Sequence, residues 1–137
     1  MYALSRILAA AACLVSGGIH LALVPGHTAG TPALAALFAA AGTALSLLGL
    51  ALALDVGTRQ VVRAASGTLA AVLVAYAVDR TVGLPLADAA EHAHGHAAGG
   101  ADTLPIATKG IEALGLVAAL ACARVSGARI GFRPVRG

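Results

Sequence analysis

The amino-acid sequence predicts an all-α membrane protein, an antiparallel bundle of four transmembrane helices. The first reason is composition, because hydrophobic residues make up 59% of the 137 residues and charged residues only 11%. A soluble domain carries about 25% charged residues, and so little charge cannot solvate the surface of a small globule. The second reason is segment length. A helix that rises about 1.5 Å per residue needs about 20 residues to cross about 30 Å of hydrocarbon.

Four apolar segments satisfy this length. They cover about residues 7–24, 32–54, 64–86 and 103–123. The second is free of ionisable side chains, and the other three together contain His20, Asp79, Arg80, Lys109 and Glu112. Arg6 before the first segment is a feature of signal peptides, but the long apolar run favours a retained helix. We therefore expect one transmembrane domain over residues 1–123, followed by a basic tail over residues 124–137.

The basic residues between the segments predict the orientation in the membrane. The connections at 25–31 and 87–102 contain no Lys or Arg, whereas residues 55–63 contain two arginines and the tail contains four. Basic residues favour the cytoplasmic side, so we expect a multi-pass protein of the cell membrane with both termini in the cytoplasm. Membrane lipids are the expected partners of the tail, at about 1 kcal/mol per basic residue near an anionic surface. Nucleic-acid binding is not expected, because no folded basic domain accompanies the tail.

Small residues recur at four-residue spacing, a pattern typical of helices that pack closely in lipid. They are Ala35, Ala39 and Thr43, then Gly42 and Ser46, and then Gly67 and Ala71. These faces predict close packing within the bundle. They equally fit a homo-oligomer or a larger membrane complex.

The polar residues of three segments are predicted to lie at nearly one depth, near the outer face. His20 lies about 6 Å from the outer end of the first segment, at about 1.5 Å per residue. The pair Asp79 and Arg80 lies at a similar depth in the third segment, and Lys109 and Glu112 lie in the first turns of the fourth. Ionisable residues inside a membrane cost roughly 2.5–3.5 kcal/mol each on insertion scales and therefore usually mark function.

This coincidence predicts a ligand-binding site. Its predicted members are His20, Tyr76, Asp79, Arg80, Lys109 and Glu112. We expect Arg80 and Lys109 to pair with the acids, which leaves His20 to face the ligand with Glu112 as its acidic neighbour. The alternative is that both basic side chains extend to the outer headgroups and the acids merely pair with them.

A second candidate site lies in the connection between the third and fourth segments. Three alternating histidines stand there beside carboxylates, namely His92, His94 and His96. Imidazole suits Zn²⁺, Cu²⁺ and Ni²⁺, so a divalent transition metal is the candidate cofactor. The Ala-Ala-Gly-Gly stretch that follows predicts a loop, and a solvated linker without a metal is the alternative.

Two short stretches carry a resemblance to known proteins. Residues 18–25 read Gly-Ile-His-Leu-Ala-Leu-Val-Pro, with His27 just after them, and residues 80–85 read Arg-Thr-Val-Gly-Leu-Pro. With Lys109 and Glu112, they resemble a family of small four-helix integral membrane proteins from actinobacteria. The resemblance covers most of residues 15–120 and implies the fold and the location of a polar site, but no reaction. That family often has an acidic residue where this chain has Gly26, and a small polar residue where it has Asp79.

These features predict a binding module rather than an enzyme. Its outward-facing polar pocket would take a small ligand, a proton or a metal ion, as part of a transport or sensing assembly. The alternative is a structural or assembly subunit of a larger membrane complex. The spans contain no Ser-His-Asp order, thiolate motif or closed metal triad, and only His20 could serve as a haem ligand, so catalysis is not expected. Cys13 and Cys122 are expected to be small buried hydrophobes.

Overall fold

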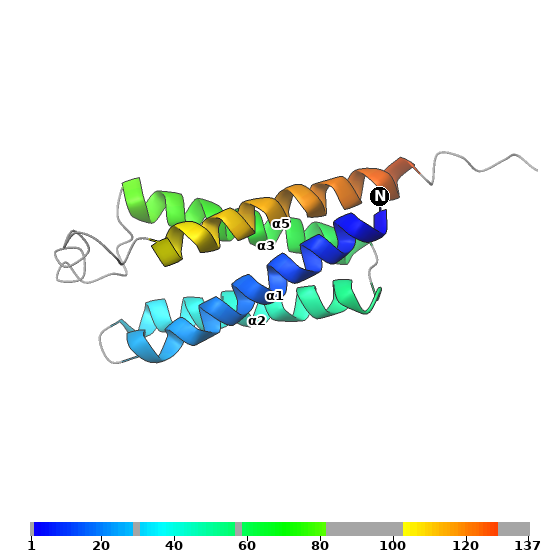
Figure 1. The fold of residues 1–137 in the computed structure, drawn as a ribbon. Helices are drawn as coiled ribbons and strands as arrows, with labels where there is room; N and C mark the ends of the chain where they lie inside the picture. The colour runs from blue at the N-terminus through cyan, green and yellow to red at the C-terminus, as the bar shows by residue number, and fades with distance from the viewer. Residues whose placement is uncertain (1, 29–30, 57–58, 82–102, 129–137) are drawn as a thin grey trace, which may run out of the picture.

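The computed structural model describes residues 2–28, 31–56, 59–81 and 103–128, and every regular element in these ranges is an α-helix. The helices are α1 (Tyr2–His27), α2 (Pro32–Ala53), α3 (Arg59–Thr81) and α5 (Thr103–Ala128) (Figure 1). All four are long and apolar enough to cross a membrane, α5 over Ile106–Val125. The prediction of an all-α fold with four candidate membrane spans is therefore confirmed.

Three helices extend beyond the limits predicted from hydropathy, and one of them is α5, which continues to Ala128, past the predicted end at residue 123. Helix α1 begins at Tyr2 and continues through Pro25 to His27, although Pro25 was expected to open a loop. Its last carbonyls still find donors, because Thr28 Oγ1 donates to the carbonyl of Pro25 and Thr31 N donates to that of His27. Helix α3 begins at Arg59, inside the predicted connection at 55–63. Hydropathy marks where a chain leaves water, whereas arginine forms helix as readily as most apolar residues.

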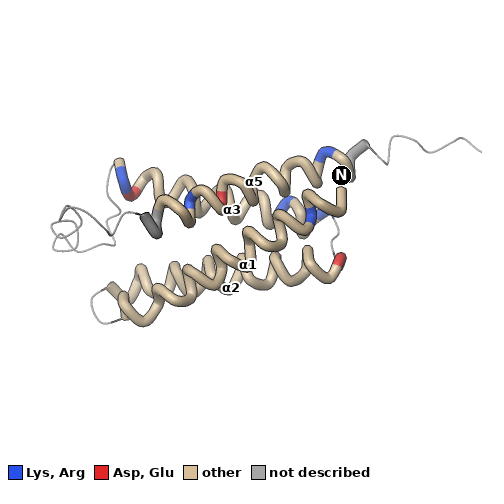
Figure 2. Tube along the Cα trace, in the orientation of Figure 1, with Lys and Arg blue, Asp and Glu red and all other residues tan. Residues whose placement is uncertain are grey.

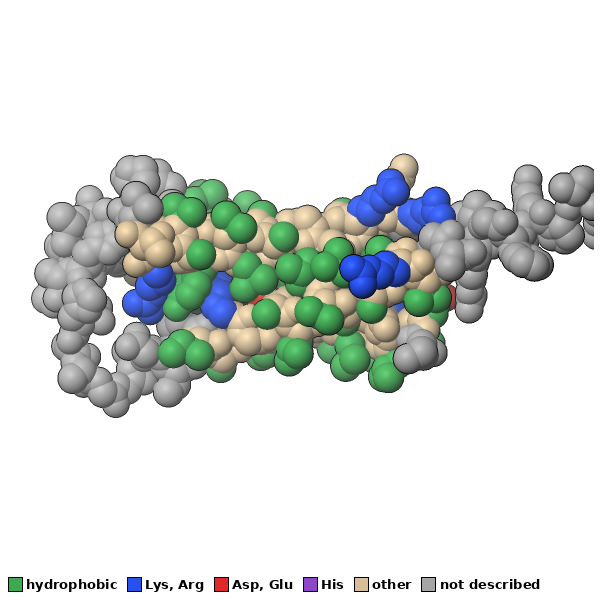
Figure 3. Space-filling view, turned by 90° about the horizontal axis from the view of Figure 1, so that it is seen from above, with side chains coloured by type: hydrophobic (Ala, Val, Ile, Leu, Met, Phe, Trp, Pro, Cys, Tyr) green, Lys and Arg blue, Asp and Glu red, His purple; other side chains and the backbone are tan. Residues whose placement is uncertain are grey.

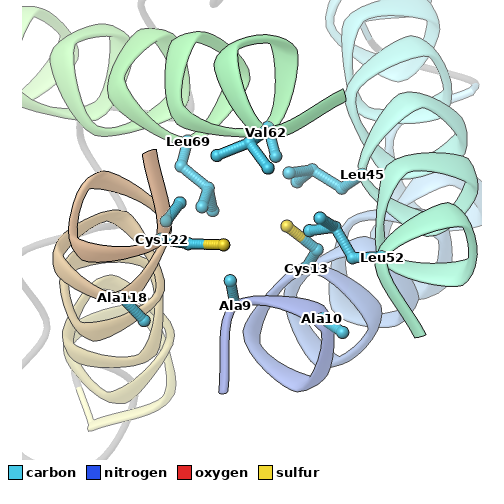
Figure 4. Close-up of a cluster of buried hydrophobic side chains, with 11 residues drawn as sticks. Ala9, Ala10, Cys13, Leu45, Leu52, Val62, Leu69, Ala118 and Cys122 are labelled. Carbon is cyan, nitrogen blue, oxygen red and sulfur yellow. The ribbon is translucent and has the colours of Figure 1, made fainter. Parts of the chain in front are cut away.

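The four helices enclose a single apolar core. Helix α1 makes the most extensive contacts with α2 and also packs on α5, which in turn packs on α3. The buried side chains at the centre come from all four helices and include Cys13, Leu45, Val62, Leu69 and Cys122 (Figure 4). Both cysteines are buried thiols directed into this core. They are the small buried hydrophobes that the sequence predicted.

Glycines allow α1 and α2 to approach closely. A Cβ atom on Gly17 would lie 2.9 Å from the carbonyl oxygen of Gly42, and one on Gly42 would lie 2.9 Å from that of Gly17. The predicted packing role of Gly42 and Ser46 is confirmed, with Gly17 as the partner on α1. Gly67 does not have this role within the bundle, because a Cβ there would meet nothing within 4 Å, and its alternative role in an oligomer stays a prediction. Helix α3 turns a different face to the core, that of Val62 and Leu69.

The outer surface of the helices is apolar, and the charges concentrate toward the helix ends (Figures 2 and 3). Large exposed side chains such as Leu47, Leu114 and Val117 cover the flanks of the helices. Arginines gather at the end where α1 and α3 begin and α2 and α5 finish, and they include Arg6, Arg59, Arg63 and Arg124. Arg6 forms an ion pair there with Asp55, which has a φ of 56°.

Candidate functional site

The candidate site is centred on the Glu112 carboxylate, which is completely buried between α5 and α1. Its Oε1 accepts a hydrogen bond of 2.6 Å from Ser16 Oγ, and its Oε2 accepts one of 2.7 Å from Lys109 Nζ. A buried carboxylate costs several kcal/mol unless it is paired and hydrogen-bonded. Both requirements are met here, since each oxygen has its own donor.

Helical spacing and close helix packing produce this arrangement. Lys109 and Glu112 are three residues apart on α5 and therefore share one face. A Cβ on Gly115, one turn further along the same helix, would collide with the side chain of Ala12 on α1. The absence of that Cβ lets α5 approach α1, so that Ser16 reaches across to Glu112.

His20 lies one turn beyond Ser16 on α1 and is also buried. Its Nδ1 is 2.8 Å from the backbone carbonyl oxygen of Ser16, 3.4 Å from Ser16 Oγ and 3.9 Å from Glu112 Oε1. A carbonyl oxygen can only accept, so Nδ1 carries a hydrogen and donates it. Within the described part of the chain, Nε2 is left without a hydrogen-bond partner and is the atom of the ring available to a ligand.

Phe38 of α2 packs against the two histidines of α1. The edge of its ring meets His20 at 5.8 Å and His27 at 4.9 Å between centroids. His27 was expected in a loop, but it is the last residue of α1, and its Nδ1 bonds the carbonyl of Leu23 at 2.9 Å. The helix continues past Pro25, so His20 lies seven residues, or about 10 Å, from the end of α1 rather than the predicted 6 Å.

The aromatic ring of Tyr76 on α3 joins two basic side chains. Lys109 Nζ lies 5.1 Å from the ring centroid and Arg80 Cζ lies 5.4 Å from it, both within the range of a cation–π interaction. Arg80 Nε also donates to the Tyr76 hydroxyl at 3.2 Å. Lys109 therefore contacts both Glu112 and Tyr76.

The six residues predicted for the site are brought together to different degrees. The expected neighbours His20 and Glu112 are in place, as are Lys109 and Tyr76. Arg80 is exposed and reaches the group through Tyr76, and half-buried Asp79 lies on the next turn of α3. The pairing of Arg80 with an acid stays a prediction.

Two residues of the site were not predicted, Ser16 and Phe38. Ser16 had a usable signal, because it is a polar residue four positions from His20 on the same helix face. Phe38 had none, since nothing in α2 indicates which of its apolar faces meets α1.

The predicted metal site lies outside the described residues, as do its histidines His92, His94 and His96. Within the ranges that the structure describes, no group of three or more His, Cys, Asp or Glu residues is placed to hold a metal ion. No known protein family, curated protein or solved structure matches the chain. The resemblance to the actinobacterial four-helix family therefore stays a prediction, and the function is argued from geometry.

Proposed function

We propose that this chain is a multi-pass protein of the cell membrane that binds a small ligand, a proton or a metal ion at a polar site near the outer ends of its helices. In this proposal the helices form an antiparallel transmembrane bundle with both termini in the cytoplasm. The chain acts as a binding module within a transport or sensing assembly and not as an enzyme. The observation that carries the proposal is the buried Glu112 carboxylate, held by Ser16 and Lys109. Ionisable groups inside membrane-spanning segments are costly and are usually kept for function.

The orientation is supported by the arginines at the end of the bundle opposite the site. Positively charged residues near the ends of membrane spans favour the cytoplasmic side. The end at which α1 begins carries Arg6, Arg59, Arg63 and Arg124. The site, nearer the other end, would then face the exterior.

Among the three ligand classes, the described residues favour the proton. Both His20 and Glu112 change charge by taking up a proton, and they lie 3.9 Å apart. Histidine is the side chain that ordinarily changes charge between roughly pH 5 and 8. A metal ion would need further ligand atoms besides those of His20 and Glu112, and the described residues do not supply them.

A tyrosine-fluorescence titration tests this proposal. The chain contains no Trp and only two Tyr, so a Tyr2→Phe background leaves Tyr76 as the sole fluorophore, 5.1 Å from Lys109 Nζ. In lipid vesicles, emission should change as the pH is lowered, because protonation of Glu112 removes the negative charge that pairs with Lys109. Glu112→Gln in the same background should remove the change. Emission that does not change with pH in either the Tyr2→Phe protein or its Glu112→Gln variant would contradict the proposal.

A second candidate function is an assembly subunit, and one observation favours it. The buried residues of α3 are confined to its first half, namely Val62, Ala65 and Leu69, whereas none of residues 70–81 is buried. The second half of α3 therefore has an apolar surface that a second copy or another membrane protein could cover. Purification from native membranes discriminates between the two, because an assembly subunit brings a stoichiometric partner with it.

A further inference from the structure

Three polar groups at the site form a hydrogen-bonded chain with one consistent direction. Nδ1 of His20 carries a hydrogen, because its closest partner is the carbonyl oxygen of Ser16 at 2.8 Å. The Ser16 hydroxyl lies 3.4 Å from the same Nδ1 and donates its own hydrogen to Glu112 Oε1 at 2.6 Å. The hydrogen on Nδ1 is therefore directed mainly to the Ser16 carbonyl and secondarily to Ser16 Oγ, and the Ser16 hydroxyl donates onward to Glu112.

The Ser16 hydroxyl is essential to this chain. The direct separation of His20 Nδ1 and Glu112 Oε1 is 3.9 Å, which is too long for a hydrogen bond. Among the described residues, Ser16 Oγ is the group that links the imidazole to the carboxylate. It lies 3.4 Å from His20 Nδ1 and 2.6 Å from Glu112 Oε1, so small movements suffice for a hydrogen bond on each side. The hydroxyl suits the role because it can donate and accept at the same time.

We propose that His20 and Ser16 form a proton relay that loads the buried Glu112 carboxylate from the outer side of the bundle. A proton binds His20 at Nε2, the Nδ1 proton passes to Ser16 Oγ, and the Ser16 hydroxyl proton passes to Glu112 Oε1. One proton enters at Nε2 and one is gained by the carboxylate, the Ser16 hydroxyl is regenerated, and the neutral imidazole is left with its hydrogen on Nε2 in place of Nδ1. The reverse transfers return the proton and restore the hydrogen on Nδ1. This inference rests on the proposed function, with the proton as the ligand.

The surrounding charges couple the relay to Lys109. From α5, His20 faces Glu112 and Lys109, and from α2 it faces the uncharged ring of Phe38. On α1 the next titratable group is His27, and on α3 Tyr76 lies beside Lys109, with Asp79 and Arg80 one turn further along that helix. Protonated Glu112 is neutral and no longer balances Lys109, which keeps the face of Tyr76 as its remaining contact at 5.1 Å. Loading thus frees the ammonium group to move.

A pH jump on the full chain in lipid nanodiscs tests the relay. Time-resolved infrared absorption follows the protonated carboxylic acid of Glu112 after a jump from neutral to acidic pH, with Glu112→Gln as the blank. Ser16→Ala should slow its appearance about 10²-fold, the scale of a lost positioned proton donor. Ser16→Thr keeps the hydroxyl and should restore the rate. His20→Ala should also be slow and should recover with added imidazole.

His27→Ala is the matched control, because His27 has the same Nδ1 contact to its own helix but no contact with Ser16 or Glu112. It should leave the rate unchanged. If Ser16→Ala fails to fold, rescue of His20→Ala by imidazole decides the question alone. Wild-type rates in both Ser16→Ala and His20→Ala would overturn the relay and leave the proposed function standing. Absence of the carboxylic-acid signal in wild type would overturn both.

Discussion

The replacement of Glu112 by glutamine tests whether the Glu112–Lys109 pair is a buried ion pair. Glu112 is completely buried, and the Lys109 side chain is only 18% exposed. Removal of one partner of a buried pair costs about 3–5 kcal/mol, because the other charge stays behind without its counter-charge. Since Lys109 retains the Tyr76 ring, we expect the lower end, about 3 kcal/mol of unfolding free energy.

The double variant Glu112→Gln with Lys109→Met removes that stranded charge. Methionine has a similar length and no charge, and the introduced glutamine side chain can still accept a hydrogen bond from Ser16. The double variant should therefore lose only about 1 kcal/mol, the worth of a typical hydrogen bond, and be more stable than the single variant by about 2 kcal/mol. Reversible unfolding by denaturant in mixed micelles measures both free energies.

The control is Asp55→Asn, which breaks an ion pair whose carboxylate is 62% exposed, although the Arg6 side chain is largely buried. Asparagine tolerates the positive φ of this position as aspartate does. Because water reaches the exposed Asp55 carboxylate and can solvate the arginine left behind, this variant should cost clearly less than Glu112→Gln. If Glu112→Gln were as mild as Asp55→Asn, or the double variant were no more stable than the single, the buried-pair reasoning would be refuted.

Three further predictions concern packing, topology and the histidine connection. Gly17→Ala should destabilise the α1–α2 contact by about 1–3 kcal/mol, because its Cβ would crowd the Gly42 carbonyl, whereas the neighbouring Gly18→Ala should be neutral or stabilising. A result in which both variants behave alike would mean that the two helices do not approach closely. Thr28→Cys should react with an impermeant thiol reagent from outside the cell and Val56→Cys only from inside, with the wild type as the unlabelled control because its two cysteines are buried. The opposite pattern would reverse the topology. Replacement of all three histidines of the connection between α3 and α5 by alanine should lower Zn²⁺ binding in detergent to background; they are His92, His94 and His96. Equal metal content in the wild type and the triple variant would contradict the predicted metal site.

Hydropathy predicted the four helices because each is apolar over most of its length. It could not predict how each helix is rotated about its axis, since an apolar side chain in a membrane protein is about equally stable against lipid and in the protein core. Gly42 and Gly67 both looked suited to helix contacts, yet only Gly42 meets another helix.

The candidate site was predictable only in part, because the sequence does not show how the helices are rotated about their axes. Helical spacing alone places Lys109 beside Glu112, and the shared depth of the polar residues predicted His20 as a neighbour. The role of Ser16 depends on how α1 is rotated toward α5, and the role of Phe38 depends on which face α2 turns to α1. Neither rotation is encoded in the order of apolar and polar residues along one helix.

The most direct test of the account is the environment of the Lys109 ammonium group in a lipid bilayer. Lys109 is the only lysine of the chain, so uniform labelling of lysine with ¹⁵N gives a single Nζ signal. With ¹³C-labelled glutamate, solid-state NMR distance measurement at neutral pH should find Nζ in contact with a carboxyl carbon, in keeping with the 2.7 Å bond to Glu112 Oε2. The contact should vanish in Glu112→Gln and weaken on acidification. An Nζ signal with no carboxyl neighbour, in rapid exchange with water at every pH, would contradict the buried site.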